Sequence, residues 1–185
     1  MSEIESRAIN VLVLVGSLRA QSVNRQLAEL AIANAPDGVR LVHFDRLGDL
    51  PHYNEDIDID PAPESVVALR AAAAEADATL VVTPEYNGSI PGALKNAIDW
   101  LSRPYGNGAL NGKPAAVIGS ALGQYGGVWA HDETRKSFGI AGPRVVDSIS
   151  LSIPSQTLDG KHPQESADVV AKVREVVEKL VAEVS

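Results

Sequence analysis

The sequence predicts a single α/β domain, residues 1–185, built on a doubly wound parallel sheet of five strands with helices on both faces. Short apolar runs alternate along the chain with longer segments in which apolar residues recur every three or four positions. The runs are apolar throughout, which is typical of parallel strands covered on both faces. Successive parallel strands need a crossover between them, and the helical segments supply it.

The boundaries of these elements follow from the apolar patterns and from the proline residues. Strands are predicted at Val11–Val15, Val39–Phe44, Ala78–Thr83, Ala115–Gly119 and Arg144–Ile149. Helices are predicted from Val23 to before Pro36, from Pro63 to Ala76, from Pro91 through Leu101, from Val128 to Phe138, and from Glu165 to Val184. The polar, proline-bearing loop from Asp45 to Pro63 is long for a connector, and such loops are usually functional or buried in an oligomer.

Composition excludes several classes of function. The chain has 16 Lys and Arg against 24 Asp and Glu, a formal net charge of -8, which argues against nucleic acid or an anionic membrane as the main partner. The absence of cysteine excludes disulfides, thiolate catalysis and cysteine-ligated metals. Met1–Arg7 is acidic and polar, unlike a signal peptide, and no apolar run approaches the roughly 18–20 residues of a membrane span. We therefore expect a cytoplasmic protein without a membrane span.

The turn after the first predicted strand carries the chemistry of an anion site. Ser17 and Ser22 offer hydroxyls, Asn24 an amide and Arg19 a permanent cation, where a helix begins at Val23. The first N–H groups of a helix lack partners and lie at the positive end of its dipole, so a phosphate monoester fits there. The alternative is an ordinary surface turn in which Ser22 caps the helix.

Two further loops, residues 84–90 and 120–127, follow the third and fourth strands as residues 16–22 follow the first. In the flavodoxin-like strand order 2-1-3-4-5 these three strands are adjacent, and ligands bind at their carboxyl ends near the switch point between strands one and three. We therefore expect the three loops to converge on one crevice.

The sequence does not match the residue spacing of several other functional motifs. The first loop lacks the glycines of a dinucleotide fingerprint, and Gly112-Lys113-Pro114 has proline where a P-loop has its hydroxyl. The histidines show no ligand spacing, and no serine lies in a hydrolase elbow. The sequence thus predicts no metal site and no acyl-transfer triad, and His131-Asp132-Glu133 is interpreted as a solvated helix face.

The block Thr83-Pro84-Glu85-Tyr86-Asn87-Gly88-Ser89 and its continuation to Trp100 resembles the signature of the NADPH-dependent FMN reductase family, which includes quinone, chromate and azoreductase-like enzymes. The motifs at residues 16–24, 50–56 and 120–127 are similar to other loops of that family, in the same order. The resemblance covers most of the chain.

The resemblance implies an FMN site built from all three loops. The residues expected to hold the phosphate are Ser17, Arg19, Ser22 and Asn24. Those expected to border the ribityl chain and the isoalloxazine are Pro84, Glu85, Tyr86, Asn87 and Ser89. Those expected to line the pyrimidine side of the ring are Ser120, Gly123, Gln124 and Gly127. Donors there would stabilise the negative charge of reduced flavin, and the glycines would let the backbone approach the ring.

The implied function is ping-pong hydride transfer from NADPH or NADH to a small oxidised acceptor such as a quinone, a flavin, an azo compound or chromate. A flavodoxin-type FMN electron carrier without nicotinamide activity is the alternative from another class, and a flavin-free regulatory protein is a third. The resemblance also implies a homodimer or homotetramer, with which the apolar Ile90, Trp100 and Leu101 are compatible.

Two features depart from the family pattern. Trp129 stands where a smaller residue is expected, and three roles are open to it: narrowing the acceptor pocket, joining a subunit interface or packing in the core. The connector Tyr105–Gly112 is rich in glycine, which leaves its role in substrate access open.

Overall fold

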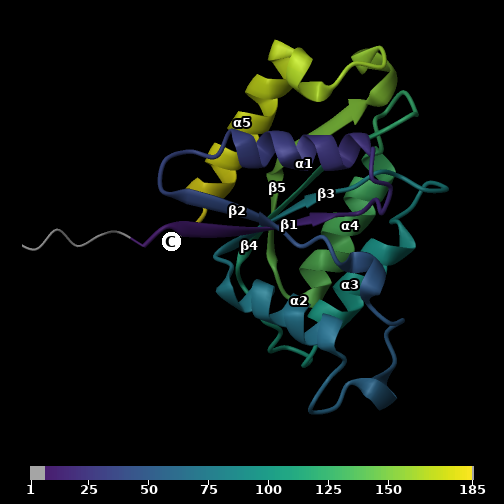
Figure 1. Ribbon diagram of the computed structural model, residues 1–185, viewed down its shortest axis with the longest axis vertical. Helices are drawn as coiled ribbons and strands as arrows, with labels where there is room; N and C mark the ends of the chain where they lie inside the picture. The colour runs from purple at the N-terminus through teal and green to yellow at the C-terminus, as the bar shows by residue number, and fades with distance from the viewer. Residues whose placement is uncertain (1–6, 185) are drawn as a thin grey trace, which may run out of the picture.

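The computed structural model describes residues 7–184, so the acidic segment Met1–Arg7, apart from Arg7, lies outside the described residues. Within this range five parallel strands form one sheet in the order β2-β1-β3-β4-β5 (Figure 1). The strands are β1 (Ile9–Val15), β2 (Val39–His43), β3 (Ala78–Val82), β4 (Pro114–Ala121) and β5 (Arg144–Pro154). The predicted fold class and strand order are confirmed.

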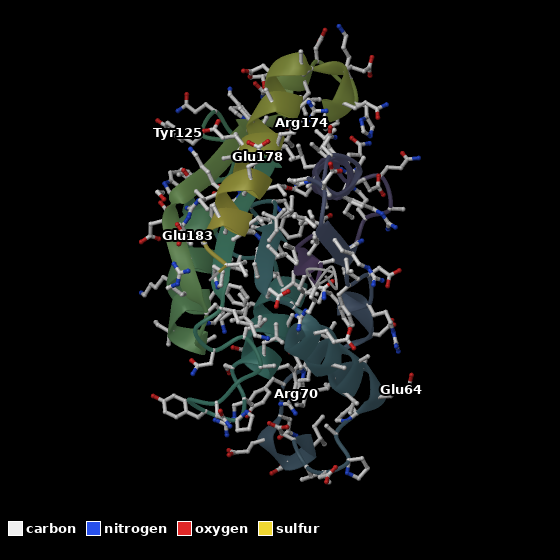
Figure 2. The ribbon with its side chains drawn as sticks, turned by 90° about the vertical axis from the view of Figure 1, so that its left-hand side faces the viewer. Glu64, Arg70, Tyr125, Arg174, Glu178 and Glu183 are labelled. Carbon is white, nitrogen blue, oxygen red and sulfur yellow. The ribbon has the colours of Figure 1, made fainter. Side chains whose placement is uncertain are left out.

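Helices cover both faces of the sheet (Figure 1). The helices are α1 (Val23–Ala33), α2 (Glu64–Glu75), α3 (Gly92–Leu101), α4 (Val128–Ala141) and α5 (Ala167–Ala182). Helices α1 and α5 bury their apolar faces on one side, where Leu27 and Val173 pack against Val13 and Leu80. Helices α2, α3 and α4 cover the other side, where Leu69, Leu94 and Phe138 meet Leu14 and Val81. Opposite the core, α5 presents charged side chains such as Arg174 and Glu178 (Figure 2).

Strand β5 is longer than predicted, because it continues past Ile149 to Pro154. Its second half pairs with Val117–Ala121 of β4 after a register shift. The sequence here alternates serine with Ile149, Leu151 and Ile153, the pattern of an edge strand with one face toward water. The extension brings the end of β5 level with the loop after β4, which matters for the site.

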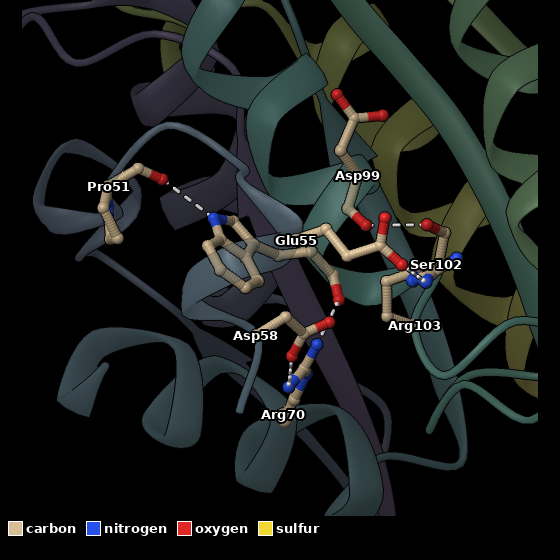
Figure 3. Close-up of polar contacts among 8 residues, drawn as sticks. Pro51, Glu55, Asp58, Arg70, Asp99, Ser102 and Arg103 are labelled. Carbon is tan, nitrogen blue, oxygen red and sulfur yellow. Dashed lines mark hydrogen bonds and ion pairs between the residues drawn. The ribbon is translucent and has the colours of Figure 1, made fainter. Parts of the chain in front are cut away.

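The long loop between β2 and α2 is fastened to α3 (Figure 3). The Pro51 carbonyl accepts hydrogen bonds from the Trp100 indole at 2.8 Å and from the Asn96 amide at 2.9 Å. Arg70 of α2 pairs with Asp58 at 2.8 Å and donates to the Trp100 carbonyl at 3.2 Å. The loop therefore packs against α2 and α3 instead of extending into solvent.

Trp100 and Leu101 are core residues, with exposed fractions of 0% and 2%. The Trp100 ring meets Tyr53 edge to face, with 5.0 Å between ring centroids, and lies under the Arg70 guanidinium. These two residues, which in the sequence are compatible with a subunit interface, therefore give no support for one. The amphipathic pattern of α3 faces the sheet and the long loop instead.

None of the helices in residues 7–184 is long and apolar enough to cross a bilayer.

Replacing Trp100 by Phe is expected to lower the free energy of unfolding by about 1–3 kcal/mol, because it removes the bond to Pro51 and leaves a void. Urea denaturation measures this change. The matched control is Trp129→Phe, since Trp129, the second tryptophan of the chain, is 58% exposed and should change stability by less than about 0.5 kcal/mol. An equal loss in both variants would contradict the anchoring role of Trp100.

Candidate functional site

The three predicted loops meet at the carboxyl ends of β1, β3 and β4 around a cavity of about 320 Å³. The lining comprises Ser17, Arg19, Ser22, Val23, Asn24, Pro84, Glu85, Tyr86, Ser120, Ala121, Leu122, Gly123 and Ser155. The predicted convergence on one crevice is thus what the structure shows. Most of the residues proposed for the cofactor border this space.

The first loop ends in a capped helix. Ser22, only 2% exposed, is the N-cap of α1, and its hydroxyl accepts from the Asn24 N–H at 3.2 Å. The first turn of α1, which lies wholly in the described part of the chain, carries no acidic side chain. Ser17 is buried with its hydroxyl 3.4 Å from the Tyr86 hydroxyl, while Arg19 is exposed at the mouth. A helix start with hydroxyls and an adjacent cation favours an anion.

Asn24 is buried rather than directed freely into the cavity. Its side-chain oxygen accepts from the Ser120 N–H at 2.8 Å, and its side-chain nitrogen donates to the Ser120 carbonyl at 2.9 Å. The side chain therefore joins the start of α1 to the end of β4. This contact fixes the first and third loops relative to one another.

The second loop is a tight turn held against α4. Tyr86 and Ser89 exchange backbone hydrogen bonds of 3.1 Å around Asn87 and Gly88, which both have positive φ. The Glu85 carboxylate accepts from the Ala130 N–H at 3.2 Å, in the first turn of α4. The Ser89 hydroxyl donates to Glu133. Glu85 and Ser89 thus use their polar side chains to hold the loop against α4.

The third loop carries a buried polar atom without a protein partner. The Ser120 side-chain oxygen makes no hydrogen bond to any described residue, although Ser120 is 2% exposed and lines the cavity. Such an orphan is costly unless a ligand satisfies it. Farther along the loop, a Cβ on Gly126 would lie 2.6 Å from the Ile153 backbone. The loop is therefore pressed directly onto β5.

Four predicted cofactor residues lie outside the lining of the cavity: Asn87, Ser89, Gln124 and Gly127. Gly127 instead serves as the N-cap of α4, with a φ of 96°. The structure adds Ser155, which directly follows β5, and the apolar Leu122. Ser155 was missed because the predicted fifth strand ended at Ile149, well short of the site.

His131 is not on a solvated helix face, so that interpretation is wrong. The side chain is fully buried at 0% exposure, whereas Asp132 and Glu133 beside it are exposed. Its ring bonds to the Thr83 carbonyl at 2.8 Å and to the Ser152 hydroxyl at 2.7 Å. The three-and-four spacing of His131, Thr134 and Phe138, all buried on α4, was the signal available in the sequence.

A second hollow of about 390 Å³ lies between α3, α4 and the segment around Tyr105 and Gly106. Its polar lining includes Lys95 and Asp99, which pair with each other at 2.7 Å. Unlike the first cavity, it is lined by none of the unpartnered buried polar atoms of the described residues. The crevice at the strand ends is therefore the candidate site.

Comparison with known proteins identifies the family. A family model described as NADPH-dependent FMN reductase matches residues 9–158. A quinone reductase of Pseudomonas putida is 47% identical over 155 residues, which cover 84% of this chain and 80% of the relative. A 2-hydroxy-1,4-benzoquinone reductase of a Burkholderia species is 45% identical over 128 residues, covering 70% of this chain and 69% of the relative.

A solved structure extends the likeness over nearly the whole chain. FerB, a flavoenzyme NAD(P)H:(acceptor) oxidoreductase from Paracoccus denitrificans, is 35% identical and superposes with a TM-score of 0.80 over 95% of this chain and 99% of its own. The resemblance found in the sequence is confirmed: the chain belongs to the NADPH-dependent FMN reductase family.

Proposed function

We propose that this chain takes hydride from NADPH or NADH and delivers the electrons to quinones, with FMN held in the 320 Å³ cavity. The enzyme class and the cofactor follow from the family. The single observation that carries the location is the unpartnered Ser120 hydroxyl, buried in a crevice that begins at the start of α1.

The residues of the first loop fit a phosphate monoester. Ser17 and Ser22 offer hydroxyls beside the first turn of α1, whose N–H groups lie at the positive end of the helix dipole. Arg19 forms no ion pair with any described residue, so its guanidinium is available to a dianion. We propose that these groups hold the FMN phosphate and that Asn24 acts mainly by positioning the loop.

The residues of the second and third loops fit the ring system. The Ser120 hydroxyl and the Gly123 backbone can donate or accept hydrogen bonds at the edge of a flat heterocycle, and Pro84 and Tyr86 offer apolar surface. When bound, FMN supplies reversible hydride chemistry, so the protein needs no acid or base of its own. Its side chains bind and orient the cofactor and leave an open side for the nicotinamide and then the acceptor.

A quinone acceptor is supported by the relatives and by the aromatic residues near the site. Tyr86 lines the cavity and is 49% exposed, and Tyr125 and Trp129 are each 58% exposed, with 6.1 Å between their rings. Tyr125 extends outward from the molecule (Figure 2). This exposure excludes the core-packing role for Trp129. Exposed aromatic rings suit a planar, conjugated acceptor such as a quinone.

We also propose a cytoplasmic homodimer or homotetramer. The support is the exposed apolar surface beside the second hollow, where Tyr105 is 86% exposed and Ile140 is 75% exposed. Light scattering of the purified protein tests the oligomeric state, and a monomer at micromolar concentration would contradict it.

The visible spectrum of the FMN-loaded protein tests the enzyme activity. Anaerobic addition of NADPH or NADH is expected to bleach the bound flavin, and a benzoquinone is expected to restore the colour. Initial rates at several concentrations of donor and acceptor should give the parallel double-reciprocal lines of a ping-pong scheme. Bound flavin that stays yellow with both donors would indicate the electron carrier instead.

Arg19→Ala is expected to weaken FMN binding by about 1.5–3 kcal/mol, which corresponds to roughly a 10- to 150-fold rise in Kd, because it removes a charged hydrogen bond to the phosphate. Riboflavin, which lacks the phosphate, should bind the variant and the parent equally. Arg40→Ala removes the same charge at the opposite end of the sheet, at the exposed start of β2, and serves as the control. An unchanged FMN affinity would remove Arg19 from the phosphate site.

A further inference from the structure

Strands β3 and β4 stop pairing at the edge of the cavity. The Thr83 N–H still donates to the Ile118 carbonyl at 2.9 Å, in line with the parallel register of Val82 and Ile118. In a parallel ladder the next bond would run from the Ser120 N–H to the Thr83 carbonyl. Each of these two groups has a side-chain partner instead. The strands therefore diverge at this position, which we call the fork (Thr83, Gly119 and Ser120).

Asn24 takes the place of β3 along the edge of β4. Its amide bonds to both backbone groups of Ser120, at 2.8 and 2.9 Å, as a neighbouring strand would. The residue is 3% exposed and comes from the first turn of α1, 96 positions away in the sequence. Without it, Ser120 would leave a buried donor and acceptor unpaired.

His131 takes the place of β4 for the other strand. A carbonyl can only accept, so the Nε2 atom that lies 2.8 Å from the Thr83 oxygen carries the hydrogen. The neutral ring then accepts at Nδ1 from the Ser152 hydroxyl, 2.7 Å away on β5. The imidazole thus joins the end of β3 to the end of β5 beneath the cavity.

Gly119 lies between these two side chains. A Cβ at this position would be 2.0 Å from the Thr83 oxygen and 2.8 Å from both Asn24 Oδ1 and His131 Nε2. These contacts are too short for any side chain, so the fork has room only for glycine. Ser120 of the fork and Pro84, which follows Thr83, both line the cavity together with Asn24.

We propose that Asn24 and His131 are positioning residues for FMN. Their side chains replace the hydrogen bond that β3 and β4 do not form between Ser120 and Thr83, and they hold the two strands apart where the cofactor enters. This rests on the proposed FMN site. In this proposal the two side chains act by holding the main chain of the site. Asn24 orients the Ser120 hydroxyl, and His131 fixes the turn that begins at Pro84.

The first test compares Asn24→Ala with Asn34→Ala, a matched asparagine at the other end of α1 whose side chain bonds to Leu30. Asn24→Ala is expected to raise the Kd for FMN at least tenfold, measured by quenching of flavin fluorescence. In the flavin-free protein it should also speed hydrogen exchange of the Ser120 amide at least tenfold. The Gly16 amide, bonded to Val82, should keep its protection.

The second test uses rescue at His131. His131→Leu leaves the Thr83 carbonyl without a donor and is expected to raise the Kd for FMN at least tenfold. His131→Gln can donate from its side-chain amide and is expected to restore binding to within threefold of the parent. Thr134→Val is the control in the same helix, because it removes a buried hydroxyl that bonds only to the Ala130 carbonyl.

A pH profile adds a readout specific to the imidazole. Burial lowers the pKa of His131 below the ordinary 6.5, and Arg135 lowers it further, while the Thr83 carbonyl, Glu85 and Asp132 oppose the shift. As the pH falls below 6.5, His131 takes up a proton in the unfolded chain before it does so in the folded chain, so the free energy of unfolding decreases. The Tm of the parent should therefore drop more steeply than that of His131→Gln between pH 6.5 and 5.

Two outcomes would overturn the proposal. Asn24→Ala and His131→Leu binding FMN as the parent does would show that the fork does not position the cofactor. Equal losses of FMN affinity in the Asn34 and Thr134 controls would show a general effect of instability. Bleaching of the parent by NADPH tests the proposed function separately, so either idea can fail without the other.

Discussion

Every buried N–H and C=O group must find a partner, and this requirement shapes the ligand-binding end of the sheet. In a parallel sheet the ligand crevice lies at the carboxyl ends of the strands, and where two neighbouring strands stop pairing at that edge they leave backbone groups free in the interior. Here the freed groups belong to Thr83 and Ser120, and two helices on opposite faces of the sheet supply the partners. The glycine at position 119 follows from this arrangement, because the Thr83 oxygen and the two partner side chains leave no room for a Cβ there.

Much of the fold could be predicted because its signals are local. The apolar runs and the helix-starting prolines at Pro63 and Pro91 placed the strands and helices, and the strand order then placed the loops around one crevice. The length of β5 could not be read in the same way. Its last residues form a strand because β4 is there to pair with, a partner far away in the sequence.

The site was predictable to the level of its loops but less so to the level of its contacts. Ser17, Ser22 and Ser120 line the cavity as expected, while Asn24, Glu85 and Ser89 use their polar atoms to hold loops together. His131 was misinterpreted because the two residues that follow it are acidic and exposed. On α4 the His131 side chain is buried while those two neighbours face solvent. A sequence shows which polar groups a loop contains. Only the folded structure shows which of them already bond to other protein groups and which are free to bind a ligand.

The spread of the crevice lining along the chain has a consequence for how the protein is made. The lining of the crevice runs from Ser17 after β1 to Ser155 after β5. The crevice is therefore complete only after β5 has been synthesised and has paired with β4. A ligand that binds the native state alone stabilises it by mass action. FMN bound at the proposed site would therefore favour the completed fold over chains that are still unfolded.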